Sequence, residues 1–255
     1  MTAAEGDIIL SADKLGKRFG GFAAVTDVDL RVRRGSIHAL IGPNGAGKTT
    51  CFNLLTKFLQ PTGGTIVFDG RDITRLAPAE IARLGLVRSF QISAVFPRLS
   101  ALENVRLALQ RRLRGDSFDF WRSERSLRTL DREARERIAA VGLSEFADMA
   151  AGALPYGRKR ALEIATTLAL EPQMLLLDEP MAGMAHEDVG RIAALIKSVS
   201  AGRTILMVEH NLSVVADLSD RITVLARGRV LAEGSYDEVA KDARVIDAYI
   251  GVGHG

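Results

Sequence analysis

Cysteine is almost absent from this chain, because Cys51 is the only one among 255 residues. A single thiol cannot form an internal disulfide, so we expect a reducing environment. Apolar runs also never approach the roughly 18 to 20 residues that a membrane-spanning helix requires. Residues 1–7 carry acidic side chains and no apolar stretch long enough for a signal peptide. The chain is therefore predicted to be a soluble cytosolic protein.

The chain also lacks a large excess of either charge, because 34 Lys and Arg residues are nearly balanced by 31 Asp and Glu residues. A net charge of +3 gives no support for nucleic-acid binding, although the pI is 9.2. Arg111–Arg137 is the exception, with nine arginines and six acidic residues. This segment has two interpretations: a solvated helical insertion, or a surface that faces anionic lipid headgroups or a partner.

Apolar residues make up 47% of the chain and are ample for a packed core. Three short runs, apolar on both faces, predict buried parallel strands covered by helices. These runs are Ser36–Ile41, Met174–Leu177 and Thr204–Val208. Ile222–Ala226 and Val230–Glu233 predict a late hairpin. Weaker strand signals in Lys17–Arg33 predict an antiparallel sheet at one edge, so the fold class is α/β.

A glycine-rich segment after the first apolar run, Gly42–Thr49 (GPNGAGKT), matches the phosphate-loop pattern G-x-x-x-x-G-K-[ST]. Its glycines let backbone N–H groups point at phosphate oxygens, and the following helix adds its positive dipole. Lys48 is predicted to lie between the β- and γ-phosphates, and Thr49 to offer its hydroxyl to Mg²⁺. The predicted nucleotide-binding residues are Gly42, Pro43, Asn44, Gly45, Ala46, Gly47, Lys48, Thr49 and Thr50.

A second element, Met174–Glu179, is an apolar run that ends in two carboxylates. Open α/β sheets bind ligands at the carboxyl ends of their strands. Asp178 is predicted to hold Mg²⁺, and Glu179 to accept a proton from the attacking water. The two elements together predict a P-loop NTPase, and a kinase, a GTPase or a transport motor all remain possible at this point.

Five further features resemble the ABC ATPases in their order and spacing. They are Phe19, Gln91, the signature segment Leu154–Gly157, the D-loop segment Pro180–Ala185, and His210. The resemblance implies that Phe19 stacks on adenine and that Gln91 contacts Mg²⁺ or the attacking water. It implies that His210 hydrogen-bonds the γ-phosphate. Leu154, Pro155, Tyr156 and Gly157 are implied to face the nucleotide of an opposite subunit. The implied catalytic residues are Glu179, His210, Gln91 and Lys48, and the implied Mg²⁺ ligands are Thr49, Gln91 and Asp178.

Smaller motifs narrow the resemblance to the ATPase subunits of branched-chain amino acid importers. They include Phe19–Val25, Pro61–Thr65, Val87–Gln91, Leu162–Ala165 and Asp247–Gly251. Importers of urea, amides and other amino acids look similar, because the ATPase never touches the cargo. The resemblance implies a RecA-like core with an antiparallel β edge, residues 1–91 and 171–255. A helical subdomain, residues 92–170, carries the signature segment.

The signature segment departs from the family pattern, because Pro155 and Tyr156 stand where Ser and Gly are usual. Pro155 lacks both a hydroxyl and an N–H. Ala185 stands at a D-loop position that is often Asp. Importers of this subfamily usually pair two different ATPase subunits, so a heterodimer is favoured and a homodimer stays possible.

The resemblance also implies partners. Membrane permease subunits would dock on the helical subdomain, and a periplasmic or extracellular substrate-binding protein would act indirectly. Phe96, Leu99, Leu102 and Glu103 are candidates for the docking contact, with a role in the subdomain core as the alternative. The subunit would lie peripherally on the cytoplasmic face of the inner membrane. Other readings are a soluble ABC-type ATPase acting on nucleic acid or ribosomes, and a binding module without turnover.

Overall fold

The computed structural model describes residues 7–89, 95–110 and 124–250. The chain divides into two compact units. Unit 1 comprises Met1–Arg88, Gln173–Met181 and Lys197–Gly255, and unit 2 comprises Ser89–Pro172 and Ala182–Ile196.

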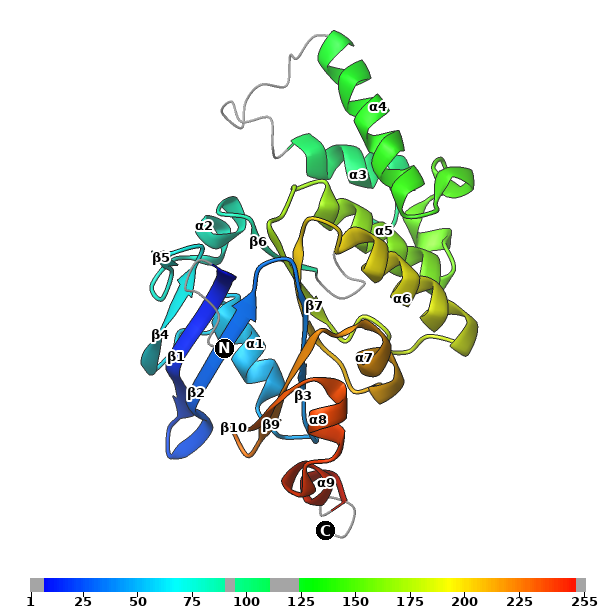
Figure 1. Ribbon diagram of the computed structural model, residues 1–255. Helices are drawn as coiled ribbons and strands as arrows, with labels where there is room; N and C mark the ends of the chain where they lie inside the picture. Colours follow the sequence, from blue (N-terminus) through cyan, green and yellow to red (C-terminus); the bar gives the residue numbers. More distant parts are fainter. Residues whose placement is uncertain (1–6, 90–94, 111–123, 251–255) are drawn as a thin grey trace. The chain divides into compact units, whose positions relative to one another are not determined.

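The first sheet is antiparallel and has the strand order β2-β1-β4-β5 (Figure 1). Its strands are β1 (Ile8–Phe19), β2 (Phe22–Arg33), β4 (Gly63–Phe68) and β5 (Arg71–Asp72). β2 alternates between buried and exposed residues over most of its length, which is typical of a sheet with one face on the core. The predicted antiparallel edge is confirmed, but its first strand begins at Ile8, before the predicted Lys17–Arg33 segment, and the sheet also includes β4 and β5.

The second sheet has the strand order β10-β9-β3-β8-β7-β6. Its strands are β3 (Ile37–Ile41), β6 (Leu86–Ser89), β7 (Met174–Asp178), β8 (Thr204–Val208), β9 (Arg221–Ala226) and β10 (Arg229–Gly234). β3 pairs in parallel with β8 and β9, and β7 pairs in parallel with β8. Every residue of β3, β7 and β8 is buried, so the three predicted parallel strands are confirmed. β9 and β10 pair in an antiparallel arrangement, which confirms the predicted late hairpin.

Helix α1 (Lys48–Leu55) lies beside β2 of the first sheet (Figure 1). It also contacts β8 of the second sheet. Phe52, Leu54 and Leu55 on this helix are fully buried in the main hydrophobic core. The core therefore fixes the helix that follows the phosphate loop. The other helices that lie wholly within unit 1 are α2 (Pro78–Arg83), α7 (Leu212–Leu218), α8 (Tyr236–Ala240) and α9 (Ala243–Ile250).

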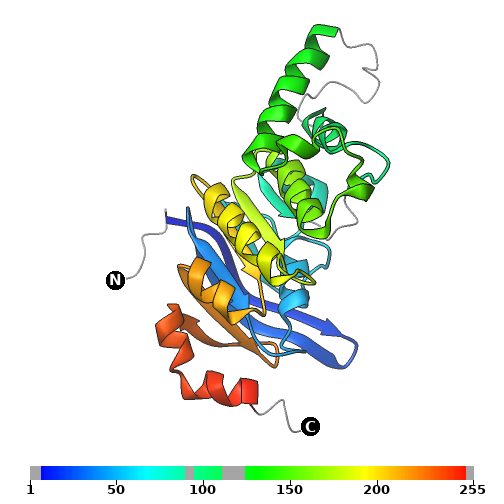
Figure 2. The same ribbon diagram turned by 90° about the vertical axis from the view of Figure 1, so that its right-hand side faces the viewer.

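Unit 2 is helical, and three of its helices pack against one another (Figure 2). They are α3 (Ala101–Gln110), α4 (Glu124–Ala140) and α5 (Tyr156–Leu168). Two 3-10 helices, Ser144–Phe146 and Ala151–Ala153, connect α4 to α5, and α6 (His186–Val199) contributes most of its length. No helix within the described ranges has the length and apolar character needed to cross a bilayer.

The signature helix begins earlier than the sequence pattern indicated. The sequence after the signature segment predicts an amphipathic helix over Ala161–Leu170, whereas α5 starts at Tyr156 with Pro155 as its N-cap. Proline costs little at a helix N-terminus, because the first N–H groups of a helix have no partner inside it. Tyr156 and Gly157 therefore belong to the first turn of α5.

The arginine-rich segment lies partly outside the described residues, since residues 111–123 are not covered. Three of its later arginines lie on α4 beside carboxylates. Arg137 contacts Glu133 and Glu171, with nitrogen–oxygen distances of 3.4 and 3.1 Å. Arg132 and Arg135 lie 4.0 and 3.9 Å from the carboxylates of Glu136 and Asp148. This part of the segment fits the solvated-helix interpretation.

Candidate functional site

The phosphate loop joins the end of β3 to the start of α1 and packs closely on its neighbours. A Cβ atom on Gly42 would lie 2.1 Å from the carbonyl oxygen of Leu225. A Cβ atom on Gly47, whose φ is 98°, would lie 2.7 Å from the carbonyl oxygen of Ala24. Real Cβ atoms do not approach oxygen so closely, so these two positions require glycine.

The turn between β9 and β10 is hydrogen-bonded to the phosphate loop. The N–H of Gly228 donates to the carbonyl of Ala46 at 2.9 Å, and its own carbonyl accepts from the N–H of Thr26 at 2.8 Å. Gly228 thus links the phosphate loop to β2. The sequence pattern marked this residue only as part of a hairpin turn, because its role depends on contacts between distant segments.

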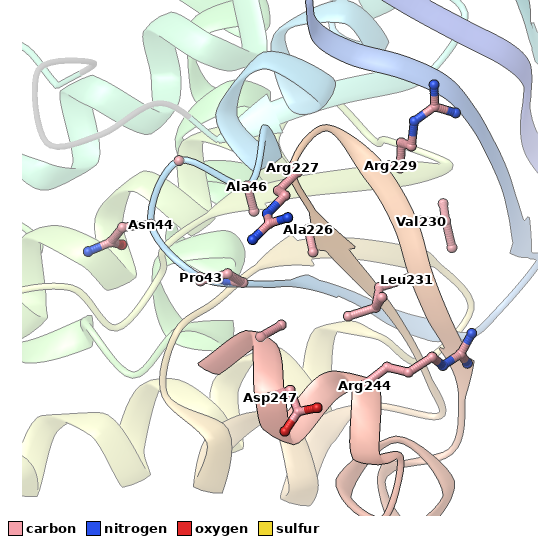
Figure 3. Close-up of a pocket in the computed structure, with 12 residues that line it drawn as sticks. Pro43, Asn44, Ala46, Ala226, Arg227, Arg229, Val230, Leu231, Arg244 and Asp247 are labelled. Atoms are coloured by element: carbon pink, nitrogen blue, oxygen red, sulfur yellow. The ribbon is translucent and has the colours of Figure 1, made fainter. Parts of the chain in front are cut away.

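A pocket of about 630 Å³ borders the outer side of the phosphate loop (Figure 3). Its walls come from Pro43–Ala46, from the β9–β10 hairpin and from α9. Arg227, Arg244 and Asp247 line it, together with apolar side chains such as Leu231. The C-terminal segment is therefore a neighbour of the phosphate loop.

Lys48 places its ammonium group inside the loop. Its Nζ donates to the carbonyl oxygens of Gly42 at 2.6 Å and of Pro43 at 3.0 Å. Burial lowers the pKa of Lys48, and the nearby carboxylate of Glu179 opposes that shift. The loop thus surrounds a cation that is close to Glu179, as expected where phosphate oxygens bind.

The ends of β7 and β8 bring the other predicted residues together. Asp178 pairs with Val208 in the parallel register, and the N–H of Glu179 donates to the carbonyl of Val208 at 2.9 Å. Asp178 is buried, whereas Glu179 is half-buried and His210 is exposed. Glu179 has a φ of 43°, a backbone conformation that non-glycine residues rarely adopt and that recurs at functional sites.

Glu209 is a residue of this region that sequence reasoning missed. Its side chain is fully buried, and its carboxylate accepts from three backbone N–H groups. The donors are Met181, His210 and Asn211, at 2.9, 3.1 and 3.2 Å. Glu209 therefore fixes the start of the D-loop segment and the backbone of His210 to the end of β8. Only its place between an apolar run and His210 hinted at this role.

Replacing Glu209 with alanine is expected to lower the free energy of unfolding by about 3 kcal/mol, because three backbone donors lose their acceptor. Chemical denaturation of the purified protein measures this loss. Glu145→Ala, at an exposed position, is the matched control and is expected to change the free energy by less than about 0.5 kcal/mol. An equal effect of the two substitutions would contradict the role given to Glu209.

Phe19 lies at the end of β1, where its ring is 47% exposed. The Nζ of Lys17 lies 5.3 Å from the centre of that ring. Phe22 pairs with Phe19 across the β1–β2 hairpin and is 68% exposed. The tip of the hairpin therefore presents two aromatic faces, of which the sequence pattern singled out only Phe19.

The signature segment and the D-loop segment meet within unit 2. The hydroxyl of Tyr156 donates to the carbonyl of Ala182 at 2.8 Å. Gly157 lies against the carboxylate of Asp188 on α6, where a Cβ atom would come within 2.5 Å of that side chain. Leu154 is buried, Tyr156 is 43% exposed, and Ala185 and His186 are exposed. Tyr156 thus replaces the usual glycine with a side chain that joins the two segments.

The predicted residue Gln91 lies outside the described residues. Within the described part of the chain, no three His, Cys, Asp or Glu side chains gather as a metal cluster. Mg²⁺ does not need such a cluster, because it keeps several waters and takes few protein oxygens. The hydroxyl of Thr49 and the carboxylate of Asp178 are oxygen donors of the kind that fits it.

One docking candidate is corrected by the structure. Leu102 is 6% exposed and belongs to the core of unit 2, so it is unavailable for a contact with a partner. Glu103 caps α3 instead of standing free, because its carboxylate accepts from the N–H of Ser100 at 2.7 Å. That hydrogen bond lowers the pKa of Glu103. Phe96 is 54% exposed, and Leu99 is half-buried.

Comparison with known proteins places this geometry in a family. The family model described as "ABC transporter" matches residues 25–182, and the model described as "Branched-chain amino acid ATP-binding cassette transporter" matches residues 229–255. The chain is 41% identical to the high-affinity branched-chain amino acid transport ATP-binding protein BraF of Pseudomonas aeruginosa. The alignment covers 95% of this chain and 98% of BraF.

Solved structures agree with the sequence comparison. The ADP conformation of MJ1267, an ATP-binding cassette of an ABC transporter, superposes with a TM-score of 0.84 at 32% identity, covering 96% of this chain and 99% of MJ1267. The dimeric structure of MJ0796, a bacterial ABC transporter cassette, gives 0.75 at 27% identity, covering 89% of this chain and 98% of MJ0796. Both confirm the RecA-like ABC fold that the motifs predicted.

These relatives do not favour an ATPase acting on nucleic acid or ribosomes. The matched family model covers most of the chain and includes the phosphate loop, Asp178 and Glu179. The chain is therefore an ATP-binding and ATP-hydrolysing subunit that belongs to the ABC transporter family, in the group of branched-chain amino acid transport ATP-binding proteins.

Proposed function

We propose that this subunit uses Mg²⁺-dependent ATP hydrolysis to power the import of branched-chain or related amino acids. The observation that carries the proposal is that Lys48 lies inside the phosphate loop close to Glu179, which directly follows Asp178 at the end of β7. The cargo is supported by the names of its relatives, since BraF is a branched-chain amino acid transport protein. In this proposal the subunit acts at the cytoplasmic face of the membrane.

The phosphate loop holds the triphosphate in this proposal. The N–H groups of Gly45 and Gly47 and the ammonium of Lys48 face the β- and γ-phosphate oxygens, and α1 adds its N-terminal dipole. Phe19 supplies an apolar face for adenine. Thr49, Asp178 and Gln91 hold Mg²⁺, which offsets the negative charge of the phosphates when it is bound.

Hydrolysis in this proposal is an attack of water on the γ-phosphorus. A new bond forms between the water oxygen and phosphorus, and the bond between the γ-phosphorus and the bridging oxygen breaks to leave ADP and phosphate. Glu179 accepts the proton that the water loses. His210 and Gln91 orient the water and the γ-phosphate, while the carboxylate of Glu209 fixes the backbone that carries His210.

The loop before α3 is the proposed contact for a membrane permease. Asn104 is buried and holds this loop, because its Oδ1 accepts from the N–H of Phe96 at 2.7 Å and its Nδ2 donates to the carbonyls of Phe96 and Ser100. The ring of Phe96 is left 54% exposed. A fixed loop that presents an aromatic ring is a suitable anchor for a short partner helix.

Phe96→Asp is expected to leave the ATPase rate of the isolated subunit within about twofold of the wild type while reducing transport by tenfold or more, since one lost anchor costs about 1.4 kcal/mol or more. Uptake by the assembled transporter measures the effect. Leu107→Asp, at another exposed apolar position in unit 2, is the control. Normal uptake with Phe96→Asp would contradict the proposed contact.

A dimer of two ATP-binding subunits is the proposed working unit, and a heterodimer is favoured. Each nucleotide would lie between the phosphate loop of one subunit and the signature segment of the other. The dimeric structure of MJ0796, a related cassette, supports a dimer of ATP-binding subunits. Pro155 and Ala185 support unequal sites, because neither side chain can donate a hydrogen bond across the interface.

Co-purification tests these partners. The tagged subunit, extracted from native membranes in detergent, is expected to carry permease subunits and a second, different ATP-binding subunit. The isolated chain bearing Glu179→Gln is expected to stay monomeric with Mg-ATP. Strong ATP-dependent homodimers of the isolated chain would contradict the heterodimer.

A further inference from the structure

Arg88 makes contacts that the proposed mechanism does not use. It lies on β6, where the Nη2 of its guanidinium donates to the Oδ2 of Asp178 at 2.5 Å. The side chains of Arg88 and Asp178 are only 15% and 11% exposed. Removing one partner of an ion pair this far from water leaves an uncompensated buried charge, so each group constrains the position of the other.

Other groups hold the guanidinium of Arg88 independently of Asp178. Its Nη1 donates to the Oδ1 of Asn53 on α1 at 2.7 Å. The rings of Phe52 and Phe58 lie 5.0 and 5.4 Å from its central carbon. A planar guanidinium suits such a place, because it can donate in its plane and stack on rings with its faces. The guanidinium of Arg88 is therefore held in one position by α1 and the two rings, and Asp178 pairs with it there.

We propose that Arg88 is a positioning residue for the metal site: it sets the orientation in which the Asp178 carboxylate meets the divalent cation. This inference rests on the proposed function, which assigns Asp178 to Mg²⁺. Partners that orient a metal-binding carboxylate commonly raise metal affinity 10- to 100-fold. Arg88 also stands three residues before Gln91 in the sequence, so the same short segment carries the support and a second proposed ligand.

The positive charge of Arg88 and its proposed positioning role have opposite effects on metal affinity, and this makes the inference testable. A fixed cation repels a divalent metal ion, so its removal alone would tighten metal binding. Loss of the orientation of Asp178 would instead weaken metal binding. The sign of the change in affinity therefore separates positioning from simple repulsion.

The experiment measures Mn²⁺ affinity by electron paramagnetic resonance, with ATP bound to the full chain carrying Glu179→Gln to prevent turnover. Arg88→Met is expected to weaken Mn²⁺ binding about tenfold or more. ATP binding in EDTA, which needs no metal, is expected to stay within about twofold. Arg83→Met, which removes an exposed arginine of α2, is the matched control and is expected to leave both affinities unchanged.

Asp178→Asn serves as the second background. It is expected to weaken Mn²⁺ binding by itself, and Arg88→Met is expected to add no further loss to it. Unchanged or tighter Mn²⁺ binding with Arg88→Met would overturn the inference while leaving the proposed function intact. Unchanged binding with Asp178→Asn would instead overturn the assignment of Asp178 to the metal.

Thermal unfolding shows whether Arg88→Met folds. If it does not, Asn53→Ala provides a second, milder test of the inference. This substitution removes one acceptor of the guanidinium and keeps the ion pair with Asp178. It is expected to weaken Mn²⁺ binding about two- to fivefold, because Arg88 is then less firmly held. Wild-type Mn²⁺ affinity in Asn53→Ala together with wild-type affinity in Arg88→Lys would also overturn the inference.

Discussion

Replacing Glu179 with glutamine is expected to reduce ATP hydrolysis by about 10²- to 10⁴-fold, the usual contribution of a general base. The amide retains the size of the carboxylate and cannot accept the proton of the attacking water. ATP binding is expected to persist, because Lys48 and the loop amides, rather than Glu179, hold the phosphates in this account. Release of phosphate under single-turnover conditions, with ATP affinity measured in parallel, checks both expectations.

Glu187→Gln, an exposed carboxylate in the first turn of α6, is the control for this change and should hydrolyse ATP at the wild-type rate. Hydrolysis that survives in Glu179→Gln would show that another group accepts the proton. Loss of both binding and hydrolysis would show that Glu179 has a structural role. Either result would require a different assignment of the catalytic base.

Gly42→Ala is expected to have the second largest effect, since the new methyl group would lie 2.1 Å from the carbonyl oxygen of Leu225. The loop must move, and we expect a loss of about 3 kcal/mol in ATP binding, or about a hundredfold in affinity. Equilibrium binding of a fluorescent ATP analogue measures it.

Gly45→Ala is the matched control for the steric argument. Gly45 also has a positive φ, 76°, and nothing lies within 4 Å of its Cβ position. Its substitution carries only the backbone strain of about 1 to 2 kcal/mol. Equal losses of ATP affinity in the two variants would refute the close packing of Gly42 as the cause.

The phosphate loop and the carboxyl end of β7 were predictable because the residues that define each of them are adjacent in the sequence. A glycine-rich loop that follows an apolar run predicts the end of a strand without information from other segments. The same holds for the apolar run that ends in Asp178 and Glu179. The three parallel strands were predictable for a related reason. Strands buried on both faces have no polar residues to obscure them.

Residues whose roles depend on distant partners were not predictable. Arg88 meets Asp178 and Asn53 only through the folded arrangement of β6, β7 and α1, and Gly228 meets Ala46 only because β9 lies beside β3. Leu102 seemed to be a candidate for docking because exposure cannot be read from an apolar residue type. The amphipathic pattern that begins at Ala161 does not include the first turn of α5, which starts at Tyr156 directly after Pro155, a residue that suits a helix N-terminus.

Uptake of a labelled branched-chain amino acid into vesicles tests the central claim most directly. The vesicles contain the complex that co-purifies with the tagged subunit, and Mg-ATP is supplied on the side of that subunit. Leucine uptake is predicted to require ATP and to be lost in the complex carrying Glu179→Gln, with the same subunits present. Leucine uptake that continues in the Glu179→Gln complex would contradict the account.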